Sequence, residues 1–325
     1  MAKVVISHRL HDDGMAILEQ ANSEIVITND GSPAAMLPEL LNADGLIIRI
    51  GSIDRQTMLQ AKNLKAIGRP GVGVDDVDVK TATELGIPIV IAPGANTRSV
   101  AEHAFALMFA CAKDLLRSDK EMRKGNFAIR SSYKAYELNG KTLALVGYGR
   151  IGSILAQISK AIGMQVKVYD PFVNQYVIEK EGYTYCTRLE DVIQHAHVIS
   201  INVPLTTETR NLIGAQEINM MMPDTILINC ARGEVIDETA LVQALEKGRI
   251  HSAGLDVFAS EPVDITASLF QLDNVTVSPH MAGQTKEAAS GVATMAAEGV
   301  IAVINGEQWP YVCNPEAYEH PRWKK

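Results

Sequence analysis

Three reactive side chains follow apolar runs in the second half of the chain, and their types suit one kind of chemistry. Arg232, Glu261 and His280 each come at or soon after the end of a run that reads as a β-strand. Histidine titrates near neutral pH, and a carboxylate beside it would orient the ring and raise its pKa. An arginine fork can hold a substrate carboxylate and polarise the carbonyl next to it. Such a set could bind a 2-keto acid and deliver a proton to its carbonyl oxygen.

Their positions along the chain carry more weight than their types. Taken singly, an arginine, a glutamate or a histidine is more often a surface or structural group. These three follow consecutive predicted strands at residues 225–229, 252–256 and 275–278. In an open α/β sheet, ligands bind beyond the carboxyl ends of the strands, so we expect the three side chains to lie at one edge.

The segment before these strands contains a turn that suits a dinucleotide. An apolar run leads into Gly147, Gly149 and Gly152 in a Gly-x-Gly-x-x-Gly pattern, followed by a helical pattern and a second apolar run ending at Asp170. The first glycine permits a tight turn, the second lets the backbone approach a pyrophosphate, and the third lets the helix pack on the strand. The helix N-terminus then offers N–H groups to the phosphates. The whole order predicts dinucleotide binding.

The acid at the end of that segment bears on which dinucleotide binds. Asp170 lies about 20 residues beyond the second glycine, the spacing of a carboxylate that accepts hydrogen bonds from a ribose diol. It would repel the 2′-phosphate of NADP, and the next residue, Pro171, is not basic. The predicted cofactor is therefore NAD. The alternative is that Asp170 merely caps the helical segment that follows it.

Size, charge and composition limit the classes of function and partner that are possible for this chain. The chain has 325 residues, enough for two domains, and a formal net charge of −8, which argues against nucleic acid as a partner. No window approaches the apolar length of a membrane span, and the N-terminus lacks the apolar core of a signal peptide. The four cysteines are scattered without metal-ligand spacing. We expect a cytoplasmic protein with reduced thiols, no bound metal and no membrane partner.

The first hundred residues alternate short apolar runs with helical patterns. The predicted strands cover residues 4–7, 25–27, 46–48, 64–67 and 87–91. The predicted helices cover residues 12–20, 34–41, 55–61 and 76–84. Repeated strand–helix units with apolar strands predict a parallel sheet that is covered on both faces.

A second strand–helix series follows a long helical pattern. That pattern covers residues 99–124, and the spacing of Ser99 and Glu102 predicts a capping box at its start. The second series starts at about residue 142, and the last helix is predicted over residues 290–305. Two doubly wound sheets would leave a cleft between them, with the cofactor along the carboxyl edge of the second sheet.

Eight segments together carry a resemblance to a known family. They are GRPGVGVDDVD (68–78), NTRSVAEH (96–103), ELNGKTLALVGYGRIG (137–152), VYDP (168–171), NVPLTTETRNLI (202–213), INCARGEVID (228–237), GLDVFASEP (254–262) and SPHMAGQT (278–285). In this order and spacing the chain resembles the D-isomer-specific 2-hydroxyacid dehydrogenases over nearly its whole length. Within that family it is most similar to the D-3-phosphoglycerate dehydrogenase branch.

The resemblance implies an architecture and an activity. It implies an α/β fold with two doubly wound parallel-sheet domains and a cleft between them. A flavodoxin-like substrate domain would comprise residues 1–98 and 290–325, and a Rossmann cofactor domain residues 99–289. The implied protein is an NAD-dependent oxidoreductase that interconverts a D-2-hydroxy acid and its 2-keto acid. It would form homodimers through the helices around the domain crossover.

The resemblance also assigns roles to individual residues. Arg232 would bind the substrate carboxylate, His280 would be the acid and base, and Glu261 would be its partner. Asp256 would sit near the nicotinamide. The implied cofactor-binding residues are Gly147, Gly149, Arg150, Ile151, Gly152, Asp170, Pro171, Val203, Pro204, Thr209, Cys230, Ala231, Asp256 and Gly283. The implied substrate-binding residues are Arg49, Arg69, Val72, Gly73 and Arg232.

Two arginines of the first domain bear on the substrate. Arg49 and Arg69 follow predicted strands, and together with Arg232 they exceed what a simple monocarboxylate requires. In the phosphoglycerate branch the matching arginines face a second anionic group, so we expect a substrate such as 3-phosphohydroxypyruvate, or a sulfonated or dicarboxylate analogue. The alternative is that both arginines pair with nearby acids: Asp44, Asp54 or Asp75.

Other functions stay open at this level. The segment 280–284 departs from the histidine-Leu-Gly-Ala pattern of the phosphoglycerate branch, and the segment 125–130 lacks a tryptophan that many relatives carry. A reductase of hydroxypyruvate, glyoxylate or sulfopyruvate is therefore a second candidate. A different class is a corepressor-like protein of the same fold that binds NAD to control assembly.

Overall fold

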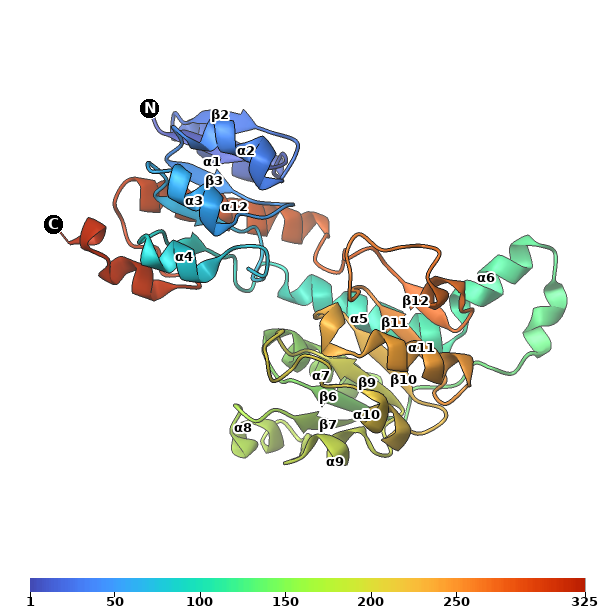
Figure 1. The fold of residues 1–325 in the computed structure, drawn as a ribbon. Coiled ribbons are helices and arrows are strands. Elements are labelled where there is room, and N and C mark those ends of the chain that lie inside the picture. The colour runs from blue at the N-terminus through green and yellow to red at the C-terminus, as the bar shows by residue number, and fades with distance from the viewer. Residues whose placement is uncertain (325) are drawn as a thin grey trace. The chain divides into compact units, whose positions relative to one another are not determined.

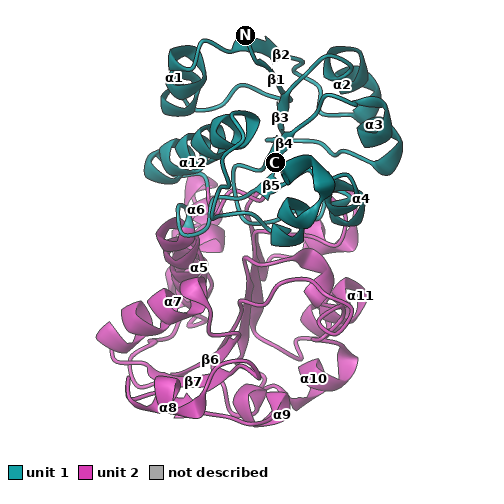
Figure 2. Ribbon diagram, turned by 90° about the vertical axis from the view of Figure 1, so that its left-hand side faces the viewer, with its two compact units in different colours: residues 1–96, 284–325 teal, residues 97–283 magenta. Residues whose placement is uncertain are grey.

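The computed structural model describes residues 1–324, which form two compact units (Figure 2). Unit 1 comprises Met1–Asn96 together with the chain from Gln284 on, and unit 2 comprises Thr97–Gly283. The chain thus enters unit 2 from unit 1 and returns to it. The predicted divisions lie after residues 98 and 289, whereas the packing of the chain divides it after residues 96 and 283.

Unit 1 contains a five-stranded parallel sheet in the order β2-β1-β3-β4-β5 (Figure 1). Its strands are β1 (Lys3–Ile6), β2 (Glu24–Ile27), β3 (Gly45–Ile47), β4 (Ala66–Gly68) and β5 (Ile89–Val90). Its α-helices are α1 (Asp12–Gln20), α2 (Pro33–Leu40), α3 (Arg55–Gln60), α4 (Val79–Glu84) and α12 (Lys286–Ile304). The short 3-10 helices η4 (Pro315–Glu319) and η5 (Pro321–Trp323) follow α12.

Both faces of this sheet are apolar and both are covered. Val5 and Leu46 pack with α2, α3 and α4 on one face, while Val4 and Ile47 pack with α1 and α12 on the other (Figure 2). Successive side chains of a strand point to opposite faces, so a continuous apolar run is what a sheet buried on both sides requires.

Unit 2 contains a seven-stranded parallel sheet in the order β12-β11-β10-β9-β6-β7-β8. Its strands are β6 (Thr142–Val146), β7 (Gln165–Tyr169), β8 (Thr184–Tyr185), β9 (Val198–Ile201), β10 (Ile226–Asn229), β11 (Ser252–Leu255) and β12 (Val275–Val277). Its α-helices are α5 (Thr97–Ala112), α6 (Leu115–Arg123), α7 (Arg150–Ala161), α8 (Gln175–Glu179), α9 (Leu189–Ile193), α10 (Ala215–Met220) and α11 (Glu238–Glu246). The 3-10 helices are η1 (Phe127–Ser131), η2 (Gly233–Val235) and η3 (Ser268–Gln271).

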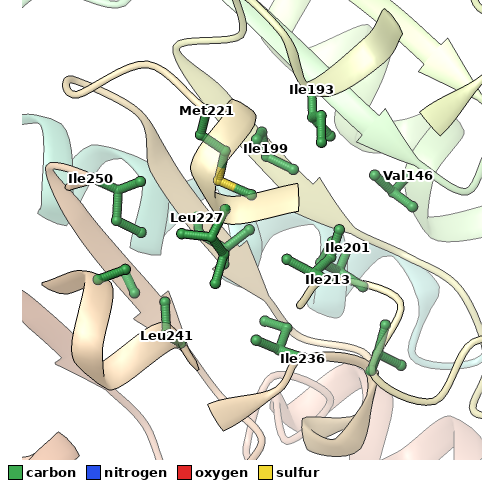
Figure 3. Close-up of a cluster of buried hydrophobic side chains, with 14 of the residues drawn as sticks. Val146, Ile193, Ile199, Ile201, Ile213, Met221, Leu227, Ile236, Leu241 and Ile250 are labelled. Carbon is green, nitrogen blue, oxygen red and sulfur yellow. The ribbon is translucent and has the colours of Figure 1, made fainter. Parts of the chain in front are cut away.

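The core of unit 2 lies on both faces of this sheet. On one face, Val146, Ile199 and Leu227 of the strands pack against side chains of α9 and α11 (Figure 3). On the other face, Leu143 and Leu145 pack against α5 and α7. The strand order reverses between β6 and β9, the point at which open α/β sheets bind ligands. The predicted class, α/β with two doubly wound parallel sheets, is confirmed.

The predicted helix over residues 99–124 is wrong in its extent. The structure has two helices there, because α5 ends at Ala112 and Asp114 adopts a left-handed backbone with φ of +50°. The Asp114 carboxylate accepts a hydrogen bond from Arg117 Nε at 2.8 Å. This contact between the residue before α6 and the first turn of α6 stabilises the separation of the two helices. The predicted capping box is also wrong: α5 starts at Thr97, and Glu102 pairs with Arg98 at 2.5 Å inside the helix.

The last long helix starts earlier than predicted and is longer. Helix α12 begins at Lys286 because the side chain of Thr285 caps it, accepting a hydrogen bond from Ala288 N at 3.2 Å. Its 19 residues are long and apolar enough to cross a membrane by length and composition alone, so the prediction that no segment reaches that length was wrong here. Its buried side chains, such as Val300 and Val303, pack in the core of unit 1, which is how the helix of a protein core behaves.

Candidate active site

The turn between β6 and α7 has the geometry that its glycines predict. Gly147 has a φ of +98°, and a Cβ there would lie 2.7 Å from the carbonyl oxygen of Asn202. A Cβ on Gly152 would lie 2.5 Å from the carbonyl oxygen of Gly147. Neither position can hold a side chain without moving backbone atoms, so the first turn of α7 lies tightly on the end of β6.

The start of α7 fits a diphosphate. Gly149 is the N-cap residue of this 12-residue helix, and a Cβ built on it would meet open space. The N–H groups of Arg150, Ile151 and Gly152 have no partners within the helix, and the helix dipole makes this end positive. The residues present therefore provide both donors and room for an anion at this place.

Asp170 is held in place at the end of β7. Its carboxylate accepts hydrogen bonds from Tyr148 N at 2.8 Å and Phe172 N at 2.9 Å. A carboxylate offers about four acceptor sites, so capacity for two ribose hydroxyls is left. The next helix, α8, is capped by the side chain of Asn174, which accepts from Tyr176 N at 2.9 Å. Asp170 is therefore not the cap of that helix, and its neighbour Pro171 is exposed.

The other predicted cofactor residues of unit 2 follow the carboxyl ends of further strands. The segment after β9 contains Val203, Pro204 and Thr209, whose hydroxyl donates to the carbonyl oxygen of Pro204 at 2.6 Å. Cys230 and Ala231 follow β10, and burial raises the pKa of the Cys230 thiol, which favours the unreactive form. Gly283 is the last residue of unit 2. In residues 1–324 no group of three or more His, Cys, Asp or Glu side chains could hold a metal ion.

Arg232 is positioned by a residue that the sequence did not single out. Asn229, buried at the end of β10, donates from Nδ2 to the carbonyl oxygen of Arg232 at 2.9 Å and accepts from Ala231 N at 2.9 Å. The Arg232 guanidinium itself donates from Nη1 to the carbonyl oxygen of Ala231 at 2.7 Å. These bonds bend the chain directly after the strand. The signal that could have identified Asn229 is an amide side chain at the last position of a predicted strand, three residues before Arg232.

His280 and Glu261 form the pair that their types predicted. Nδ1 of His280 lies 2.7 Å from Oε2 of Glu261, whose other oxygen accepts from Phe258 N at 3.1 Å. The hydrogen bond to Glu261 raises the pKa of His280, against the opposing effect of burial. Partial burial acts to raise the pKa of Glu261, but the bond and charge of His280 outweigh it and the pKa lies below its ordinary value.

Arg232 belongs to the same cluster. Its charge contributes to lowering the pKa of Glu261 and opposes the protonation of His280, so all three side chains act on one another. The structure therefore gathers a histidine, its carboxylate partner and a guanidinium at the carboxyl edge of one sheet. This edge also contains the glycine turn, because all seven strands run parallel.

Asp256, expected near the nicotinamide, is buried and bonded to the segment that carries His280. Its carboxylate is 1% exposed and accepts hydrogen bonds from the hydroxyl of Ser278 at 2.6 Å, Met281 N at 2.9 Å and Ala282 N at 2.8 Å. Its oxygens are thus bound to the segment that carries His280. Neither Ser278 nor this function of Asp256 was apparent from the sequence.

Arg69, one of the two substrate arginines predicted in unit 1, is bound within that unit. It pairs with Asp76 at 2.9 Å and donates to the carbonyl oxygens of Ile48 at 2.6 Å and Gly73 at 3.2 Å. Of the acids considered as partners, Asp44 pairs with Lys65, and Asp54 caps α3. The guanidinium of Arg69 thereby fixes the turn after β4.

Arg49 is more accessible than Arg69. It is exposed at the end of β3 and donates from Nη1 to the carbonyl oxygen of Arg9 at 3.1 Å. Val72, also predicted to bind substrate, is exposed, and Gly73 contributes the carbonyl that Arg69 holds. All four residues therefore follow strands β3 and β4 of unit 1.

Comparison with known proteins agrees with this geometry. Residues 105–282 match the family described as D-isomer specific 2-hydroxyacid dehydrogenase, NAD binding domain. The chain is 39% identical to a D-3-phosphoglycerate dehydrogenase of Methanocaldococcus jannaschii, over 97% of the chain and 60% of that protein. It is 34% identical to a glyoxylate reductase of Thermococcus litoralis, over 97% of each. The crystal structure of the TT0316 protein from Thermus thermophilus superposes with a TM-score of 0.84, at 31% identity over 96% of this chain and 99% of that one.

The lengths differ between the two groups of relatives. The chain spans 60%, 58% and 55% of three D-3-phosphoglycerate dehydrogenases that it matches, but nearly all of the glyoxylate reductase. The matched family domain covers more than half of the chain, including the glycine turn, Arg232, Glu261 and His280. The chain therefore belongs to the D-isomer-specific 2-hydroxyacid dehydrogenase family, and residues 105–282 are its nicotinamide-dinucleotide-binding domain.

Proposed function

We propose that this protein catalyses the NAD-dependent interconversion of a D-2-hydroxy acid and its 2-keto acid. The observation that carries the proposal is the bond of 2.7 Å between His280 and Glu261, with the charge of Arg232 acting on both. The pair lies at the carboxyl edge of the sheet that also bears the glycine turn. A positioned acid–base group beside an arginine that can bind a carboxylate is what this reaction requires.

Each side chain has a definite task in the proposed reaction. Arg232 binds the carboxylate of the substrate and polarises the carbonyl next to it. Nδ1 of His280 is bonded to Glu261, so Nε2 gives its proton to the keto oxygen in reduction and takes it back in oxidation. The negative charge of Glu261 stabilises the imidazolium that reduction needs. The nicotinamide ring, when bound, supplies or accepts the hydride.

The pH dependence of reduction tests the role of Glu261. Because the pKa of His280 is raised, kcat/KM for keto-acid reduction should be level below that pKa and fall as the pH rises through it. Glu261→Gln removes the charge that stabilises the imidazolium, so the falling limb should move to lower pH. Glu246→Gln, an exposed change at the end of α11, is the control. If the falling limb of the pH profile stays at the same pH in Glu261→Gln, the charge of Glu261 does not stabilise the imidazolium of His280.

The cofactor preference depends on Asp170. We propose NAD rather than NADP because the fixed carboxylate of Asp170 would accept from the ribose hydroxyls and repel a 2′-phosphate. Asp170→Asn should raise the dissociation constant of NADH about tenfold to a hundredfold, the value of a hydrogen bond to a charged group. It should also reduce the preference over NADPH, as measured by the fluorescence of the bound reduced cofactors. An unchanged ratio of the two constants argues against this role.

We propose a substrate with two anionic ends, such as 3-phosphohydroxypyruvate or a sulfonated or dicarboxylate analogue. Exposed Arg49 supports this, while Arg69 is already bound to Asp76 and to two carbonyl oxygens. The names of the curated relatives favour two candidates, phosphoglycerate and glyoxylate, so a glyoxylate or hydroxypyruvate reductase is the second proposal.

A panel of 2-keto acids with NADH tests the substrate class. We expect higher kcat/KM for 3-phosphohydroxypyruvate or sulfopyruvate than for pyruvate, and Arg49→Ala should remove that difference while sparing pyruvate. Arg9→Ala, a change of a neighbouring arginine that pairs with Asp12, is the matched control. Equal or better turnover of pyruvate contradicts a dianionic substrate. Preferred turnover of glyoxylate establishes the second proposal instead.

The segment after α5 is the proposed homodimer contact. This segment, residues 115–131, contains the helices α6 and η1, and the structure describes all of it. Neither helix has a buried side chain. They expose Leu115, Leu116, Met122 and Phe127, and α6 stands away from the sheet of unit 2 (Figure 1). An apolar surface of this kind marks an interaction site. A second copy would cover it, giving a solution mass of twice that of the chain.

A further inference from the structure

The segment that carries His280 is bonded to a helix far from it in sequence. The hydroxyl of Ser278 donates to Oδ1 of Asp256 at 2.6 Å, and Nε2 of His103, on α5, lies 2.7 Å from the same hydroxyl oxygen. Asp256 is almost fully buried beyond the end of β11, and His103 is partly buried. These three side chains form a row from α5 to the segment before His280, entirely within unit 2.

The chemistry of the groups fixes the direction of this row. A serine hydroxyl has one proton, and an ionised carboxylate has none to give. The Ser278 proton therefore lies toward Asp256, and its oxygen must accept a hydrogen bond from His103. His103 thus carries its proton on Nε2, and the order of donation is His103 to Ser278 to Asp256. Replacing His103 with a side chain that cannot donate leaves Ser278 without this bond.

Asp256 in turn determines the backbone that presents the imidazole. His280 has a φ of +50°, a left-handed conformation uncommon for residues other than glycine. Its N–H donates to the carbonyl oxygen of Asp256 at 2.8 Å, and the N–H groups of Met281 and Ala282 donate to the Asp256 carboxylate. The position of this carboxylate therefore determines the direction in which the His280 side chain points from the backbone. A surrounding structure must hold such a conformation, and here Asp256 does so.

We propose that His103 and Ser278 are positioning residues for His280, acting through Asp256. They keep the Asp256 carboxylate in the place where it fixes the left-handed backbone of His280. The imidazole of His280 therefore stays within hydrogen-bonding distance of Glu261. The effect on turnover rests on the proposed function, in which His280 is the acid and base. The effect on the position and titration of the His280 imidazole does not depend on the proposed function. The charged groups that act on His280 are Glu261, Arg232 and Asp256.

Turnover by a set of variants is the first test. His103→Leu and Ser278→Ala should each lower kcat about tenfold to a hundredfold, as a small misplacement of a catalytic group does, with little change in KM. The double variant should be no slower than the slower single one, because both changes break the same row. His103→Gln can place an amide N–H where Nε2 was and should recover most of kcat. Multiplying effects in the double variant, or no recovery in His103→Gln, contradicts the proposal.

The titration of the His280 imidazole is the second test and needs no substrate. NMR of the ligand-free full chain follows this ring, identified by the loss of its signal in His280→Asn. His103→Leu and Ser278→Ala should lower the pKa of His280, since the ring loosens from Glu261, while His103→Gln should preserve it. His195→Asn, in an exposed loop, is the control that should leave both the pKa and kcat unchanged.

The two tests separate the inference from the proposed function. A pKa of His280 that falls in His103→Leu, in a protein that reduces no keto acid, supports the positioning role and contradicts the activity. A pKa and a kcat that stay unchanged in both His103→Leu and Ser278→Ala overturn the positioning role. If His103→Leu does not fold, as judged by thermal unfolding, the smaller truncation Ser278→Ala decides the question with the same two measurements.

Discussion

His280→Asn is expected to lower kcat for 2-keto acid reduction by about 10²–10⁴-fold, the usual contribution of a positioned general acid. Asparagine tolerates the left-handed backbone that this position has, with φ of +50°, so the fold should survive the change. The glycine turn and Asp170 are untouched, so NADH should bind with unchanged affinity. Steady-state kinetics and NADH fluorescence titration measure the two quantities separately.

The control for this variant is another histidine with a positive φ. His195 has a φ of 61° in an exposed loop, and His195→Asn should leave both kcat and NADH affinity unchanged. A loss of kcat below about tenfold in His280→Asn would be too small for a general acid. Such a result would move the proton transfer to a different group. A loss of NADH binding would instead give His280 a structural role in the cofactor site.

Arg232→Gln is expected to have the second largest effect. Removing one partner of a buried charged hydrogen-bond pair costs about 2–5 kcal/mol, mostly because the other charge is left unpaired. In kcat/KM for the keto acid this corresponds to about 30-fold to 4000-fold. The loss should appear for every substrate of the panel, because every 2-keto acid has the carboxylate that Arg232 is proposed to bind.

Two further variants identify the nature of that contact. Arg232→Lys keeps the charge but not the fork, so it should recover only part of the activity. Arg188→Gln, which removes an exposed arginine paired with Glu190, is the matched control and should have no effect. If Arg232→Gln impairs only dianionic substrates and spares pyruvate, Arg232 binds the second anionic group and its proposed role is wrong.

The fold could be predicted from the sequence because its signals are local. Apolar runs marked strands buried on both faces, and the first helix was predicted with its exact bounds, Asp12–Gln20. The turn at Gly147 and Gly152 was also predictable, since the tight packing there excludes any side chain. The break in the long helix was not, because it depends on the left-handed backbone of one residue, Asp114, which no periodicity reveals.

The site was predictable in its residue types but not in its partners. His280 and Glu261 were paired correctly because both follow strand ends of one parallel sheet. The hydrogen bonds of Asp256 to the His280 segment depend on tertiary packing, as does the pairing of Arg69 with Asp76 in the turn after β4. Strand ends and hydrophobic periodicity do not predict such bonds. The bonds that position the site residues are therefore the part of the site that the sequence predicts least well.

Isotope transfer measures directly whether a hydride passes between a nicotinamide and C2 of a D-2-hydroxy acid, as we propose. The protein is incubated with the best keto acid of the panel and with NADH that carries deuterium on one face of C4, in a separate reaction for each of the two faces. We expect a D-2-hydroxy acid with deuterium at C2 from one of the two labelled cofactors. NADH binding without any labelled hydroxy acid from the whole panel, or a labelled L-hydroxy acid, would rule out the proposed function.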